Sequence, residues 1–253
     1  MRPLWKRKLY SLFLARDTKR ALRQLRRLEY RLPSPESRFA VPFTFKGSRT
    51  FRTINPLQTP KEIEGLYRLA LSHNPSRVLE VGTAKGGTLY LWCQAAADDA
   101  KIVSIDLPWG KFGGGYEKPR ADLYNAFARE SQTLHLLRGD SHADETRKKI
   151  KDLFGADPID FAFIDGDHFY EGVKSDFIAY GPMVRPGGLI GFHDIMPAHH
   201  DHEIEVNQLW DQLKDQLPSQ EFVFEDHAGR KLGIGVVTVP EGGIPQALLD
   251  GLK

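Results

Sequence analysis

Five acidic side chains close five apolar runs of the sequence, and carboxylates in such places can do chemistry. They are Glu80, Asp106, Asp140, Asp165 and Asp194. A carboxylate can accept hydrogen bonds from hydroxyl groups, balance a cationic ligand or bind a divalent metal ion. Because Asp is also common in turns and at helix N-termini, one such residue alone would have an equally good structural explanation. Their repetition at five equivalent places predicts one common site.

Histidines accompany two of these acids. His168 follows Asp165 by three residues, and His193 directly precedes Asp194. An imidazole can take up a proton near neutral pH and can also bind a metal ion. Helix capping or packing is the structural alternative for His168. A further cluster, His199 to His202, is interpreted as a lid that faces the substrate, with an ordinary solvated loop as the alternative.

Strands must position these residues, because the runs that they close alternate with helical patterns. The runs read RVLEV, KIVSID, LHLLRG, IDFAFID, GLIGFHD, EFVFED and GIGVVTV. Helical patterns separate the first five, which predicts a parallel sheet covered by helices on both faces, with ligands beyond the carboxyl ends of its strands. The last two runs are close enough for an antiparallel hairpin at the sheet edge. The predicted fold class is therefore α/β, a doubly wound, mostly parallel seven-stranded sheet with an antiparallel last strand and an N-terminal helical extension.

The chain is expected to have three parts. Residues 1–32 form a basic amphipathic helical extension, residues 33–59 a linker without a sustained period, and residues 60–253 the main domain. Thr59 and Glu62 have the spacing of a capping box, which predicts a helix from about residue 60 to residue 73.

Positive charge is concentrated at the N-terminus. The chain carries +2 at neutral pH, but residues 1–31 hold eleven Lys and Arg against two acids, so this segment carries +9 and the remainder −7. Such a helix can lie on anionic lipid, contact nucleic acid, dock on a partner subunit or pack on its own domain with a solvated face. The acidic main domain argues against a nucleic-acid substrate. Peripheral membrane or subunit contact through residues 1–31 and a homo-oligomer remain open expectations.

Composition favours a cytoplasmic protein. No apolar run reaches the roughly 18–20 residues of a membrane span, and charges interrupt the N-terminus too often for a signal peptide. The single cysteine, Cys93, excludes an internal disulfide and favours a reducing compartment. Association with the inner membrane surface through the basic helix is compatible with this location.

The glycine loop after the first run distinguishes between nucleotide-like ligands. Its pattern is Glu80-x-Gly82-x-x-x-Gly86, whereas a dinucleotide fingerprint requires G-x-G-x-x-G. This pattern and the order of acids over about residues 60–240 resemble the class I S-adenosylmethionine-dependent methyltransferases. The missing glycine and the absence of a Tyr-x-x-x-Lys pair count against a nicotinamide-dependent oxidoreductase. That class stays an alternative, together with a non-catalytic binding protein that uses the basic helix.

The resemblance implies S-adenosylmethionine as the cofactor, and a sulfonium cation suits a carboxylate-rich site. By the family pattern, Asp106 would accept hydrogen bonds from both ribose hydroxyls, and Asp140 would face the adenine amino group. Glu80 would anchor the loop or the ammonium end. The implied cofactor residues are Glu80, Gly82, Thr83, Gly86, Asp106, Asp140, Ser141 and Asp165.

The ends of the fourth and fifth runs resemble the catechol-type and cephalosporin-hydroxylase-like O-methyltransferases. In that group an acid after the fourth strand and two adjacent polar residues after the fifth hold a divalent cation, which maps onto Asp165, His193 and Asp194. Magnesium and manganese both stay open, and His193 slightly favours manganese. His168 occupies the place of the general base, where the group has lysine, so the implied catalytic residues are His168 and Asp165. The implied reaction is O-methylation of a small metabolite, a sugar or a glycan.

Overall fold

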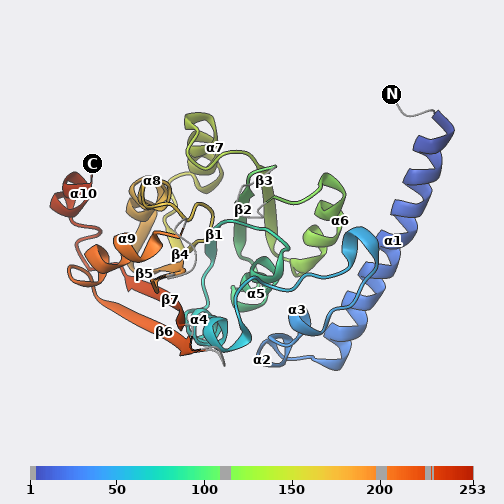
Figure 1. Ribbon diagram of the computed structural model, residues 1–253, viewed down its shortest axis with the longest axis horizontal. Coiled ribbons are helices and arrows are strands. Elements are labelled where there is room, and N and C mark those ends of the chain that lie inside the picture. Colours follow the sequence, from blue (N-terminus) through green and yellow to red (C-terminus); the bar gives the residue numbers. More distant parts are fainter. Residues whose placement is uncertain (1–3, 109–114, 198–203, 226–228, 230, 253) are drawn as a thin grey trace.

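A seven-stranded sheet crosses the centre of the molecule in the order β3-β2-β1-β4-β5-β7-β6 (Figure 1). The computed structural model describes residues 4–108, 115–197, 204–225, 229 and 231–252, with side chains from residue 13 onward. Neighbours among β1 to β5 are parallel, and β7 is antiparallel to both β5 and β6. The predicted α/β fold with an antiparallel edge is confirmed.

The strands follow the predicted apolar runs closely. They are β1 Arg77–Val81, β2 Lys101–Asp106, β3 Thr133–Arg138, β4 Ile159–Ile164, β5 Val184–His193, β6 Ser219–Glu225 and β7 Lys231–Thr238. Because successive side chains of a strand point to opposite faces, Val78 and Leu79 belong to two different core clusters. Strand β4 is buried along its whole length, as expected for a strand covered on both faces.

Helices cover both faces of the sheet. They are α1 Leu4–Arg31, α2 Pro35–Arg38, α3 Val41–Thr44, α4 Pro60–His73, α5 Gly87–Ala95, α6 Ala121–Tyr124, α7 Asp144–Phe154, α8 Tyr170–Tyr180, α9 Val206–Lys214 and α10 Gln246–Leu252. Single 3-10 turns are η1 Arg49–Phe51, η2 Lys118–Arg120, η3 Asn125–Phe127 and η4 Gly181–Met183. One core cluster includes α1, α4 and α5, and the other includes α7 to α10. The sheet is therefore doubly wound.

Helix α4 begins and ends as the sequence predicts. Thr59 accepts a hydrogen bond from the backbone N–H of Glu62, and the Glu62 side chain accepts one from the backbone N–H of Thr59. This reciprocal pair satisfies two donors that a helix N-terminus otherwise leaves without partners. The helix ends at Asn74, which adopts the left-handed conformation with φ of 47°. The capping box thus determines where α4 begins.

The N-terminal segments pack on the main domain. Ala21 and Leu25 of α1 are buried, and so are Phe51 and Ile54 from the segment between α1 and α4. Residues 33–59 therefore contribute to the core, which their lack of a sustained period did not indicate. The division of the chain at residues 32 and 59 stays a prediction. No helix among those described is both long and apolar enough to span a bilayer.

Candidate active site

A cavity lies at the carboxyl ends of β1, β2, β4 and β5, where ligands bind in open parallel sheets. Its volume is about 140 Å³. The lining residues are Leu57, Gly82, Ala84, Asp106, Asp165, Gly166, His168, His193 and Asp194. The glycine loop and the candidate metal residues therefore share one cavity.

The two glycines of the loop have different neighbours. Gly82 has a φ of 100°, and a Cβ atom added to it would overlap the carbonyl oxygen of Asp165. Gly86 has a φ of 81°, and a Cβ atom there would lie 2.6 Å from the ring of Tyr124. Since φ values in this range strain any residue with a Cβ atom, both positions favour glycine. Gly82 lies at the cavity, whereas Gly86 makes room for the protein's own aromatic ring.

Gly82→Ala is expected to lower the free energy of unfolding by about 2–4 kcal/mol, because the methyl group adds steric overlap to backbone strain. Gly243→Ala is a matched control, since Gly243 has a φ of 79° and no atom within 4 Å of its added Cβ. Only the strain of about 1 kcal/mol should appear in the control. Urea unfolding measures both values, and equal losses would refute the role of close approach at Gly82.

Asp106 is held at the end of β2 by backbone N–H groups. Its Oδ2 atom accepts a hydrogen bond from Ala84 N at 2.6 Å, and its Oδ1 atom accepts one from Gly115 N at 2.8 Å. Burial raises the pKa of Asp106, although these N–H groups partly offset that effect. The carboxylate therefore connects the glycine loop to the segment that follows β2.

Glu80 is fully buried beneath the glycine loop. Ser104 Oγ donates to Glu80 Oε2 at 2.5 Å and also lies 2.5 Å from Thr83 Oγ1. Burial raises the pKa of Glu80 to about 8, although the hydroxyls of Ser104 and Thr88 partly offset it. These contacts favour the loop-anchoring role over contact with a ligand's ammonium group. Glu80 and Thr83 do not belong to the cavity lining.

Glu80→Gln is expected to stabilise the fold increasingly as pH rises. The pKa of Glu80 is about 8 in the folded state and 4.5 in the unfolded chain. The free energy of unfolding of the wild type therefore decreases as pH rises from 4.5 to 8. A neutral amide removes this loss, and the difference between variant and wild type should reach roughly 4 kcal/mol at pH 8. Urea unfolding at pH 5 and pH 8 tests this, and a difference that is independent of pH would contradict it.

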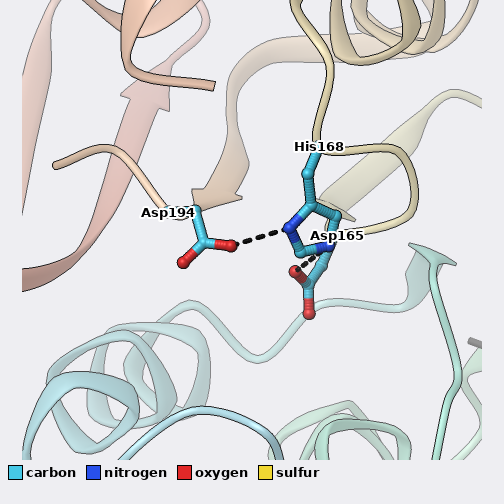
Figure 2. Close-up of side chains that lie close together, drawn as sticks. All are labelled: Asp165, His168 and Asp194. Carbon is cyan, nitrogen blue, oxygen red and sulfur yellow. Dashed lines mark ion pairs between the residues drawn. The ribbon is translucent and has the colours of Figure 1, made fainter. Parts of the chain in front are cut away.

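Three side chains from the ends of β4 and β5 converge, as Figure 2 shows. His168 Nδ1 lies 2.8 Å from Asp194 Oδ2, and His168 Nε2 lies 4.0 Å from Asp165 Oδ1. One possible ligand atom from each of the three residues lies within 4.8 Å of the others, so the structure groups His168, and not the predicted His193, with the two aspartates as possible metal ligands. Asp194 adopts the left-handed conformation with φ of 59°, a strained backbone of the kind that clusters at functional sites.

His193 lies between the two carboxylates. Its Nδ1 atom is 3.1 Å from Asp165 Oδ1 and 3.4 Å from Asp194 Oδ2. Burial alone lowers the pKa of His193, but the carboxylates of Asp165 and Asp194 outweigh burial and raise it well above 6.5. Burial likewise lowers the pKa of His168, and Asp194 and Asp165 raise it overall. Burial raises the pKa of Asp194, whereas the two imidazoles lower it by more.

Two residues at this site were missed from the sequence. Gln58 Nε2 donates to Asp165 Oδ2 at 2.6 Å, and Glu62 Oε1 lies 3.3 Å from His193 Nε2. Both side chains are almost completely buried. The capping box identified Glu62 as a helix cap, but no signal in the sequence connected it with His193. Gln58 directly precedes this capping box, and no sequence pattern indicates that it belongs to the site.

Like Glu80, Thr83 and Gly86, the predicted cofactor residues Asp140 and Ser141 do not belong to the cavity lining. Asp140 Oδ1 accepts a hydrogen bond from His142 N, and the Ser141 carbonyl oxygen accepts one from Tyr180 Oη. Their contact with an adenine ring stays a prediction. The predicted lid, residues 199–202, lies outside the described residues.

Residues 79–195 match the family model of a methyltransferase domain. This segment contains the glycine loop, Asp106 and the candidate metal residues. These residues form a methyltransferase domain. The match favours a methyltransferase over the oxidoreductase and the non-catalytic alternatives, and it agrees with the order of acids along the sheet.

Relatives of this methyltransferase include proteins of known and unknown function. It is 28% identical over 170 residues to an uncharacterized protein of Sinorhizobium fredii, covering 65% of this chain and 18% of that protein. It is 27% identical over 130 residues to mycinamicin VI 2''-O-methyltransferase of Micromonospora griseorubida, covering 49% and 28%. The chain thus spans less than a third of the length of either relative.

The fold of the methyltransferase also matches solved structures. One is the O-methyltransferase TomG of Streptomyces achromogenes in complex with SAM, with a TM-score of 0.50 and 21% sequence identity. The match covers 68% of this chain and 78% of TomG. It agrees with the Rossmann-like architecture of the sheet.

Proposed function

We propose that this methyltransferase transfers the methyl group of S-adenosylmethionine to a hydroxyl oxygen of a small metabolite or a sugar, assisted by a divalent cation. The observation that carries the proposal is the single cavity that joins Gly82 and Asp106 to Asp165, His168 and Asp194. A cofactor bound at Gly82 and Asp106 would have its methyl group near Asp165, His168 and Asp194.

Asp106 is the proposed cofactor-binding residue of the cavity. Each carboxylate oxygen can accept a second hydrogen bond, so Asp106 can bind two ribose hydroxyls while it keeps its contacts with Ala84 and Gly115. Gly82 lets the loop approach closely. Asp165 and Asp194 add negative charge to the same cavity, which suits the sulfonium cation.

The donor atoms at β4 and β5 fit a divalent cation. Asp165 and Asp194 would supply carboxylate oxygens, and His193 Nδ1, which lies 3.1 Å and 3.4 Å from them, would supply an imidazole nitrogen. We assign Asp165, His193 and Asp194 as the ligands of magnesium or manganese. When bound, a divalent cation supplies positive charge that lowers the pKa of an acceptor hydroxyl.

His168 is the proposed base. Asp194 orients its ring through the 2.8 Å contact at Nδ1, and the imidazole lines the cavity. The acceptor hydroxyl gives its proton to His168, and its oxygen forms a bond to the methyl carbon. The bond between this carbon and sulfur breaks, the electron pair stays on sulfur, and S-adenosylhomocysteine leaves.

Without a bound cation, Asp194 and Asp165 outweigh burial and raise the pKa of His168. The rate is expected to rise with pH until His168 is neutral, because an imidazole accepts a proton only in that form. His168→Gln should lower kcat about 100-fold or more and remove this rise. Profiles of kcat from pH 5.5 to 9 measure both effects. A variant that keeps the wild-type profile would exclude His168 as the base.

The acceptor is proposed from the chemistry of the site and from one relative. The name mycinamicin VI 2''-O-methyltransferase specifies O-methylation of a small molecule, which supports the same class of acceptor here. Incubation with S-adenosylmethionine, Mn²⁺ or Mg²⁺ and a panel of hydroxylated metabolites and sugars tests the proposal. Mass spectrometry should detect S-adenosylhomocysteine and an O-methylated product. Methylation of nitrogen or carbon alone would contradict it.

A further inference from the structure

A buried carboxylate contacts His193 on the side away from the two aspartates. Glu62, near the start of α4, has a side chain that is only 1% exposed. Its Oε1 atom accepts a hydrogen bond from Thr59 N at 2.7 Å and lies 3.3 Å from His193 Nε2. Glu62 does not line the cavity, so it acts on the cavity only through His193.

This contact determines which ring nitrogen of His193 carries the proton. An ionised carboxylate only accepts hydrogen bonds, so a favourable contact between Glu62 Oε1 and His193 Nε2 requires an N–H on that nitrogen. The neutral imidazole then has its lone pair on Nδ1. That atom lies 3.1 Å from Asp165 Oδ1 and 3.4 Å from Asp194 Oδ2.

We infer that Glu62 is a positioning residue that makes His193 a metal ligand through Nδ1, an inference that rests on the proposed function above. Ligating histidines usually donate their second ring N–H to a carboxylate, which fixes the ring and increases its basicity. Glu62 supplies that carboxylate, and cation binding releases any proton held on Nδ1 to solvent.

The ligand set has a consequence for the choice of metal. Imidazole nitrogen suits transition-metal ions better than magnesium, which prefers oxygen donors and water, and manganese is a transition metal that also accepts carboxylate ligands. A site with Asp165, Asp194 and a Glu62-oriented His193 therefore selects Mn²⁺ over Mg²⁺.

The test measures Mn²⁺ binding to the full chain by calorimetry and by pulsed electron paramagnetic resonance, which detects a directly bound imidazole nitrogen. Wild type should bind Mn²⁺ at least 10-fold more tightly than Mg²⁺ and show the nitrogen coupling. Glu62→Ala should weaken Mn²⁺ binding about 10–100-fold. Glu62→Gln keeps an acceptor oxygen and should lose less. His193→Ala should abolish the nitrogen coupling, whereas His168→Ala should retain it.

Thr59→Ala is the matched control for damage to α4. It removes the hydroxyl that caps Glu62 N but leaves the backbone N–H of Thr59 and the Glu62 side chain in place. Its melting temperature should fall while Mn²⁺ affinity stays at the wild-type value. If Glu62→Ala fails to fold, Glu62→Gln carries the comparison.

The outcomes separate this inference from the proposed function. Wild-type protein that binds no Mn²⁺ would overturn the metal role and this inference together. Mn²⁺ binding with unchanged affinity in both Glu62 variants would overturn the inference alone. Nitrogen coupling that disappears in His168→Ala and persists in His193→Ala would also overturn it, because His168 would then be the ligand. An equal affinity for Mg²⁺ would exclude the selection of Mn²⁺.

Discussion

Asp106→Ala is expected to abolish detectable binding of S-adenosylmethionine. Two hydrogen bonds to a charged acceptor are lost, each worth about 1.5–3 kcal/mol, which corresponds to at least a 100-fold loss of affinity. The backbone N–H groups of Ala84 and Gly115 also lose their hydrogen-bond acceptor, so the two segments that Asp106 connects are held less rigidly. Isothermal titration calorimetry measures the loss directly.

Asp165→Ala provides the comparison within the same cavity. It removes one carboxylate but leaves Asp106 in place, so much of the cofactor affinity should remain. Asp106→Asn keeps one carboxamide oxygen and should show an intermediate affinity. The melting temperature of each variant separates a loss of fold from a loss of binding. Unchanged affinity in Asp106→Ala would show that the cofactor is held elsewhere.

Asp194→Ala is expected to remove the stimulation of turnover by a divalent cation while much of the cofactor affinity remains. Asp194 contacts His168 at 2.8 Å and His193 at 3.4 Å, so the substitution removes a proposed metal ligand and the group that orients the proposed base. Loss of both effects should lower kcat by about 1000-fold or more.

The measurement is turnover with and without added Mn²⁺ or Mg²⁺. Asp211→Ala is a suitable control, because Asp211 is an exposed acid on α9 and pairs with Lys214 rather than with a residue of the cavity. It should retain wild-type turnover and cation stimulation. Persistent cation stimulation in Asp194→Ala would exclude this residue from the metal site.

Residues at strand ends could be predicted because the fold brings these ends together. Apolar runs determine where a strand stops, and the parallel arrangement places the next residues at one edge of the sheet. Asp106, Asp165 and Asp194 line the cavity for this reason. Asp140 also follows a strand, but β3 is the outermost strand on its side, two places from β1. The position of Asp140 after a parallel strand therefore predicts the correct edge of the sheet, but it does not predict that Asp140 lies outside the cavity lining.

Gln58 and Glu62 could not be predicted, because their contacts depend on how α4 packs on the sheet. Gln58 lies 107 residues from Asp165 in the sequence, and Glu62 lies 131 residues from His193. A capping pattern states which backbone group a side chain caps, but not what lies on its other side. The contact between Gly86 and the ring of Tyr124 was missed in a similar way, since that ring comes from α6. The cofactor role of Gly86 stays a prediction.

The close approach of Gly82 to the Asp165 carbonyl oxygen leaves no space between the cofactor loop and a proposed cation ligand. A displacement of one backbone would therefore displace the other, and the two binding equilibria would then be thermodynamically linked. If the cofactor strengthens cation affinity by some factor, the cation strengthens cofactor affinity by the same factor. Each partner would then report on the other in titrations, and neither dissociation constant would be a fixed property of the protein alone.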